Sequence, residues 1–92
     1  MKIGIDTLGL EHGQSGLGSY LFYLMENLSQ NDSIEYELFG QEADRYTYKA
    51  KFDVKYSAVN VSDSVNSQQR WHRWHLNKFV RSQKYDAVIY CA

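Results

Sequence analysis

The sequence predicts an α/β fold in which helices cover a parallel sheet. Two observations carry this prediction. Strand-like segments alternate with stretches of helical periodicity along the 92 residues, and such alternation indicates parallel strands joined by right-handed crossovers. The first strand also runs into a glycine-rich loop and an amphipathic helix, as in a doubly wound sheet. The sequence therefore predicts a Rossmann-like parallel sheet with the strand order 3-2-1-4 and the first strand at the switch point.

The N-terminal stretch contains the first strand, a glycine loop and the first helix. Ile3 and Ile5 are β-branched residues of a buried strand over residues 2–8. Ser15 has the chemistry of a helix N-cap. Four glycines mark the loop and the start of the helix: Gly9, Gly13, Gly16 and Gly18. Apolar residues at spacings of three and four then predict one buried helix face: Leu17, Tyr20, Leu21, Leu24, Met25 and Leu28.

The middle of the chain is predicted to supply the second and third strands. Apolar and acidic residues alternate over residues 34–39, as in a half-buried strand. Residues 41–51 are polar and are expected to form a loop or a short helical turn. Alternation resumes over residues 52–56, and Val59 and Val61 either extend that third strand or follow it.

The last third of the chain is predicted to form a second long helix and a fourth strand. After a polar connection over residues 62–67, residues 68–84 place apolar and aromatic side chains on one broad face: Trp71, His75, Leu76, Phe79 and Val80. Residues 85–92 form an apolar strand with no helix after it. Because a parallel sheet needs both faces covered, we expect a bare face and an open edge at this strand, and a larger protein of which these residues are a truncated part.

Composition describes a small globular domain with unevenly placed charge. The 92 residues allow one domain at most, and the net charge is −1. Residues 1–44 contain eight acidic residues and one basic residue, whereas residues 45–92 contain nine basic and three acidic residues. Overall near-neutrality argues against a dedicated nucleic-acid binder. A single cysteine, no signal-peptide pattern and no long apolar run predict a cytoplasmic protein without an internal disulfide.

Three kinds of phosphate site use a glycine loop of this sort. A P-loop is excluded because it needs a lysine beside its last glycine, and this loop has none. A dinucleotide-binding turn is disfavoured because Leu21 stands where its third glycine would be and because the loop is too long. We favour a longer loop that meets a diphosphate or a sugar through backbone N–H groups. The predicted site residues are Ser15, Gly16, Leu17 and Gly18, with Asp6 at the strand end as a further candidate.

Asp6 and the histidines each have a functional and a structural interpretation. Asp6 either faces the ligand or hydrogen-bonds loop amides at the end of the strand, and the sequence weighs these equally. His72 and His75 are three residues apart and can share a metal ion, with distant His12 as the one further histidine. Half-burial of these histidines against the sheet is favoured, and no metal site is predicted.

The helix over residues 68–84 carries five basic residues and no acidic residue. Trp71 shares the apolar face with Phe79, whereas Trp74 projects away from it and is expected to be partly exposed. We favour a helix that covers the sheet. The alternative is peripheral membrane contact through this helix, at the inner face of the membrane.

Three segments occur in an order that is typical of one enzyme family. Residues 1–7 read MKIGIDT, residues 15–20 read SGLGSY, and residues 84–90 read KYDAVIY after a basic, tryptophan-rich helix. Together they resemble the N-terminal domain of a GT-B glycosyltransferase, and more narrowly the retaining family 4 enzymes that use nucleotide sugars. Ser19 stands where the family commonly has an arginine, and Tyr90 where many members have a histidine. Any charge contact from position 19 is therefore lost.

The resemblance implies a two-domain enzyme with its active site in the cleft between the domains. The N-terminal domain would mainly bind the acceptor, and its glycine loop would approach the donor diphosphate. A C-terminal domain, beyond Ala92, would hold most of the nucleotide-sugar site. The resemblance implies no metal or other cofactor, because helix N-termini and basic side chains offset the diphosphate charge. The partners implied are a nucleotide-sugar donor and a sugar, glycan or lipid-linked acceptor.

On this basis we expect the N-terminal part of a hexosyltransferase-type glycosyltransferase, inactive without its second domain. The alternative is a stand-alone nucleotide- or phosphate-binding α/β module without catalysis. The open edge at the fourth strand separates the two expectations, because a complete module covers such an edge and a fragment exposes it.

Overall fold

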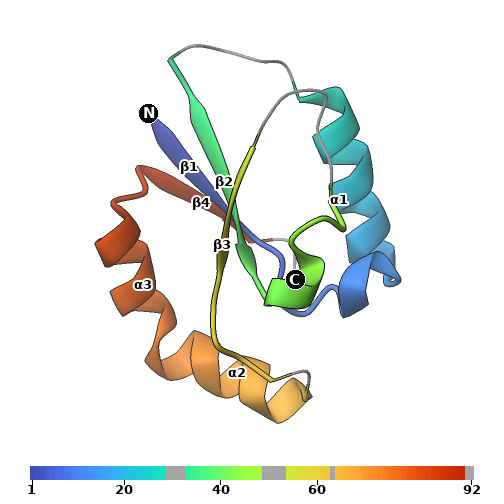
Figure 1. The fold of residues 1–92 in the computed structure, drawn as a ribbon, viewed down its shortest axis with the longest axis vertical. Coiled ribbons are helices and arrows are strands. Elements are labelled where there is room, and N and C mark those ends of the chain that lie inside the picture. The colour runs from blue at the N-terminus through green and yellow to red at the C-terminus, as the bar shows by residue number, and fades with distance from the viewer. Residues whose placement is uncertain (29–32, 49–53, 63, 91–92) are drawn as a thin grey trace.

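The computed structural model describes residues 1–28, 33–48, 54–62 and 64–90, and it confirms the predicted α/β sheet (Figure 1). All strand pairs are parallel, and the order is β3-β2-β1-β4. The strands are β1 (Lys2–Asp6), β2 (Glu35–Gly40), β3 (Lys55–Ala58) and β4 (Ala87–Tyr90). At the end of β1, Asp6 lies in register with Phe39 of β2 and Tyr90 of β4, so these three strands end at one edge of the sheet.

Helices lie on both sides of the sheet, as expected for parallel strands (Figure 1). The helices are η1 (Glu11–Gly13), α1 (Gly16–Asn27), η2 (Glu42–Asp44), α2 (Val65–Trp74) and α3 (Leu76–Gln83). Helix α1 covers one face, and α2 and α3 cover the other. β4 is an edge strand, as predicted, and none of its residues is fully buried. The predicted strand residues 52, 53, 91 and 92 lie outside the described parts of the chain.

The face of the sheet under α1 is packed by residues that α1 contributes at i, i+3 and i+7. Gly18, Leu21 and Met25 are the buried residues of α1, and Leu21 and Met25 pack with Ile5 and Leu38 of the sheet. The predicted helix face was partly wrong, because Leu17 and Tyr20 are exposed. Gly18 packs closely against Gly13 of the loop. This contact places the side of α1 that contains Gly18 against the rest of the protein. Leu17 thereby becomes a surface residue beside the loop.

The opposite face of the sheet is packed around Phe39. Its ring lies 6.2 Å from that of Trp71, 5.0 Å from that of Phe79 and 5.8 Å from that of Tyr85, measured between centroids. Trp71 is buried, whereas Trp74 is 69% exposed. This confirms the prediction that Trp71 covers the sheet with Phe79 while Trp74 projects away.

The single helix predicted over residues 68–84 is two helices. Helix α2 begins earlier, at Val65, because Ser64 lies at its N-cap and accepts a hydrogen bond from the Ser67 N–H at 3.1 Å. The helical path breaks at His75, where φ is −120° and ψ is −20°. His75 is exposed and does not join the covered face, contrary to the prediction. The break changes the direction of the chain between Trp71 and Phe79, and both rings still reach Phe39.

Strand β2 is more deeply buried than its alternating sequence predicted. Glu37 is buried, although an acidic residue in a half-buried strand would face water. The Tyr85 hydroxyl donates a hydrogen bond to the Glu37 carboxylate, and the Lys2 Nζ atom lies 3.8 Å from it. These partners explain how β2 accepts a carboxylate inside a sheet covered on both faces.

Val59 follows the third strand and donates its N–H to the Gly40 carbonyl at 2.8 Å.

Candidate functional site

The candidate site lies at the carboxyl edge of the sheet, where β1 ends and the glycine loop begins (Figure 1). In sheets with this strand order, ligands bind at this edge beside the central strand. Asp6 reaches the edge from β1, and Ser15, Gly16, Leu17 and Gly18 reach it from the loop and the first turn of α1. Among the described residues, the polar partners of the Asp6 side chain are Leu8 and His72. The structure therefore divides the predicted site residues into two groups.

The first group is a carboxylate–imidazole pair. Asp6 Oδ1 accepts the Leu8 N–H at 2.9 Å, and Asp6 Oδ2 lies 2.5 Å from His72 Nε2. The Asp6 side chain is 4% exposed and the His72 side chain 31% exposed. Burial raises the pKa of Asp6, and the hydrogen bonds from the Leu8 amide and His72 offset part of that rise. The amide contact confirms the structural interpretation of Asp6.

The contact between Asp6 and His72 was not predicted from the sequence. The two residues are 66 positions apart, and α2 brings the histidine across the edge of β1. A buried carboxylate fixes the orientation of an imidazole, and an imidazole held in this way can accept a proton on its other nitrogen. The pair therefore has the chemistry of a proton acceptor at the end of β1.

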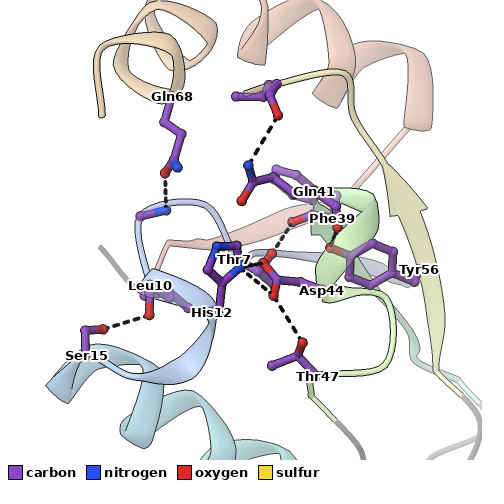
Figure 2. A network of polar contacts seen from close by, with 12 residues as sticks. Thr7, Leu10, His12, Ser15, Phe39, Gln41, Asp44, Thr47, Tyr56 and Gln68 are labelled. Atoms are coloured by element: carbon purple, nitrogen blue, oxygen red, sulfur yellow. Dashed lines mark hydrogen bonds and ion pairs between the residues drawn. The ribbon is translucent and has the colours of Figure 1, made fainter. Parts of the chain in front are cut away.

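The glycine loop is held in one conformation by hydrogen bonds at both ends (Figure 2). The Gly9 N–H donates to Gln68 Oε1 of α2 at 2.8 Å, and the Ser15 hydroxyl donates to the Leu10 carbonyl at 3.0 Å. Between them, Gly13 has a φ of +86°, which favours glycine, and a Cβ atom there would lie 2.5 Å from the Phe22 ring. The loop thus has a preformed path to the first turn of α1.

The second group is the exposed first turn of α1. Ser15 is the N-cap, as predicted, and accepts the Gly18 N–H at 2.9 Å. A Cβ atom on Gly18 would lie 2.6 Å from the Gly13 Cα atom, so Gly18 is required for packing. A Cβ atom on Gly16 would meet nothing within 4 Å, and Leu17 is 49% exposed. The first N–H groups of a helix have no partner inside it and carry partial positive charge. The backbone at Gly16 and Leu17 is therefore open to an anion.

A second aspartate–histidine pair joins the glycine loop to the loop after β2. Figure 2 shows His12 of η1 pointing at Asp44 of η2. The His12 Nδ1 atom lies 2.9 Å and 3.0 Å from the two Asp44 carboxylate oxygens, and the Thr47 hydroxyl donates to Asp44 Oδ1 at 3.1 Å. Asp44 is buried. No sequence spacing indicates this pair, because only the parallel pairing of β1 with β2 brings the two loops to the same edge.

The histidines do not gather around a common point. His12 lies with Asp44 and His72 with Asp6, and His75 is exposed. Within residues 1–28, 33–48, 54–62 and 64–90, no three His, Cys, Asp or Glu side chains form a group that fits a metal ion. In the same residues, no helix has both the length and the apolar character needed to cross a bilayer.

No family model, curated protein or solved structure matches this chain. The family resemblance drawn from the sequence motifs therefore stays a prediction.

Proposed function

We propose that this chain is the N-terminal, acceptor-side part of a glycosyltransferase that transfers a sugar from a nucleotide-sugar donor to an acceptor. The open backbone at Gly16 is the observation that carries the proposal. This glycine is not required by packing, since a Cβ atom there would meet nothing within 4 Å. It begins α1 at the carboxyl edge of the central strand, where a diphosphate can approach the helix N-terminus.

The proposed donor contact is made by backbone N–H groups. Gly16 and Leu17 supply the first amides of α1. The sequence has no lysine or arginine between Lys2 and Arg45, so the glycine loop itself contains neither. Two hydrogen bonds to a charged diphosphate, at about 1.5–3 kcal/mol each, correspond to a dissociation constant of about 1 mM. This affinity is weak for a donor substrate. It fits a domain that contacts the diphosphate while a second domain supplies most of the donor site.

The proposed acceptor contact is made by the Asp6–His72 pair. His72 is partly exposed and is held by a carboxylate at 2.5 Å, so it can accept a hydrogen bond or a proton from an acceptor hydroxyl. Tyr90, in register with Asp6 on the neighbouring strand, is exposed at the same edge and can add an aromatic surface for a sugar ring. In this assignment, Asp6 orients His72 and does not touch the acceptor.

The proposal is tested by following the backbone amides of the 92-residue chain by NMR during titration with UDP-glucose, UDP and uridine. We expect UDP-glucose and UDP to shift the Gly16 and Leu17 amide signals, with a dissociation constant of about 1 mM. Uridine has no phosphate and is expected to leave these signals in place. No response to either diphosphate, or a response confined to other parts of the chain, would contradict the proposal.

A further inference from the structure

The outer face of α2 and α3 carries cations and one exposed tryptophan. Residues 64–85 contain five basic residues and no acidic residue. All five are exposed. Arg70 and Trp74 are four residues apart on α2, and Lys78 and Arg81 are three apart on α3, so each pair shares one side of its own helix. We call these four residues the basic face.

The basic face spans the break between α2 and α3, where the chain changes direction. The His75 N–H donates to the Trp71 carbonyl at 2.8 Å, and the Phe79 N–H donates to the His75 carbonyl at 3.0 Å. Helical hydrogen bonds of the usual i to i−4 type therefore continue on both sides of His75. The two helices nevertheless differ in direction, and Arg70 of α2 and Lys78 of α3 are connected by the hollows that they line on either side of His75.

Among the described residues, Trp74 packs with no ring of the core beneath it. The core on this side of the sheet is formed by Leu8, Phe39 and Trp71, and Trp74 stays 69% exposed. The Arg73 guanidinium lies 5.6 Å from the centroid of the Trp74 ring. An exposed indole flanked by arginine is the arrangement found where proteins meet the polar boundary of a lipid bilayer.

Two adjoining hollows lie beside the basic face, between α2–α3 and the segment that follows β3. Their volumes are about 190 Å³ and about 420 Å³, and both are lined by Asn60, Trp71 and His75. Arg70 lines the smaller hollow and Lys78 the larger one. No carboxylate is among the described residues that line them. The hollows therefore offer cationic and aromatic walls to an anionic group.

We propose that the basic face docks on an anionic phospholipid bilayer, with Trp74 at the headgroup level and lipid phosphates seated in the two hollows, beside Arg70 and His75 in the smaller and beside His75 and Lys78 in the larger. Charge complementarity supports this occupant, because residues 64–85 carry five exposed basic residues and no acidic residue. Net charge near zero makes nucleic acid the weaker alternative. The proposal does not rest on the proposed transferase function, since the basic face is on the side of the sheet opposite α1.

The test is co-sedimentation of the 92-residue chain with vesicles. One set is pure phosphatidylcholine and the other is an equal mixture of phosphatidylcholine and phosphatidylserine. We expect binding to the mixed vesicles alone, with loss of that binding when NaCl is raised from about 0.05 M to about 0.5 M. Lys78→Gln should lower the partition coefficient by about fivefold, the effect of one basic residue near an anionic surface. Trp74→Ala should lower it as well.

Two control variants separate the basic face from general charge and aromatic content. Lys55→Gln removes the same charge from β3, and Tyr23→Ala removes an exposed aromatic side chain from α1. Both should bind mixed vesicles as the unsubstituted chain does, and circular dichroism should show that all variants are folded. Absence of binding to mixed vesicles, or equal losses in Lys55→Gln and Lys78→Gln, would overturn the proposal. Binding to a DNA duplex without binding to vesicles would overturn it in favour of nucleic acid.

Discussion

A Cβ atom placed on Gly18 would lie 2.6 Å from the Gly13 Cα atom, whereas one placed on Gly16 would meet nothing within 4 Å. Neither glycine has a positive φ, so a side chain at either position is limited by space alone. Gly18 is explained by packing. Gly16 has no such explanation, and an approaching ligand is a sufficient reason for a glycine at an exposed helix start. Two glycines that look alike in the sequence therefore have different physical causes.

This difference predicts opposite effects of alanine at the two positions. Gly18→Ala should destabilise the fold by about 1–3 kcal/mol, the usual cost of forcing extra volume into a packed contact. Gly16→Ala should be neutral or stabilising by up to about 1 kcal/mol, because alanine is the better helix former. Urea denaturation of the two variants measures both effects. Equal destabilisation would show that Gly16 also has a packing role.

Tyr56 connects β3 to the loop after β2 and gives a pH-dependent prediction. Its hydroxyl donates to the Gln41 carbonyl at 2.5 Å, and burial raises its pKa to about 12. Because this pKa exceeds the unfolded value of about 10, the neutral hydroxyl stabilises the fold fully below pH 10. That stabilisation is lost as the pH rises toward 12.

The prediction is measured as the difference in unfolding free energy between the unsubstituted chain and Tyr56→Phe. The difference should be about 1 kcal/mol at neutral pH, the usual net value of one hydrogen bond, and should shrink above about pH 10. Burial also raises the pKa of Tyr85. Because Tyr85 is present in both proteins, its contribution to the unfolding free energy cancels in the difference. A difference that stays constant up to pH 11 would contradict the account, since ionisation of Tyr56 would then cost nothing.

At the scale of elements, the sequence predicted the strands, their order and both helical regions. These predictions succeeded because periodicity and turn chemistry are local properties. The failures are positions where a distant contact overrides the local pattern. Gly18 turned the buried side of α1 away from Leu17, His75 broke the second helix, and Tyr85 with Lys2 made a buried Glu37 acceptable.

The candidate site was likewise predictable only where it depends on residues that are close in the sequence. The N-cap at Ser15 and the exposed start of α1 follow from residues that are neighbours in the sequence. Neither aspartate–histidine pair does. Asp6 and His72 are 66 positions apart, and His12 and Asp44 are 32 apart. No spacing pattern links such residues, and they meet only because parallel pairing brings the loops of β1, β2 and α2 to one edge of the sheet.

The whole molecule presents two surfaces, one at the carboxyl edge of the sheet and one along the outside of α2 and α3. The start of α1 and the Asp6–His72 pair lie at the carboxyl edge, and the basic face lies along the outside of α2 and α3. We propose a diphosphate for the first surface and an anionic bilayer for the second, and substitutions at Gly16 and at Lys78 test them separately because these residues lie in different helices. In a transferase with a lipid-linked acceptor, the basic face would bring the acceptor side of the domain to the membrane.

The most direct test of the central claim compares UDP-glucose binding by the unsubstituted chain, Gly16→Val and Asn27→Val. Valine at position 16 adds a branched side chain next to the first amides of α1, and valine at position 27 changes the far end of the same helix. We expect Gly16→Val to weaken binding by about tenfold or more, which corresponds to the loss of at least one charge-assisted hydrogen bond. The Asn27→Val variant should have a melting temperature and a UDP-glucose affinity close to those of the unsubstituted chain. Unchanged binding by a folded Gly16→Val protein would contradict the claim that the donor diphosphate meets α1 at this residue.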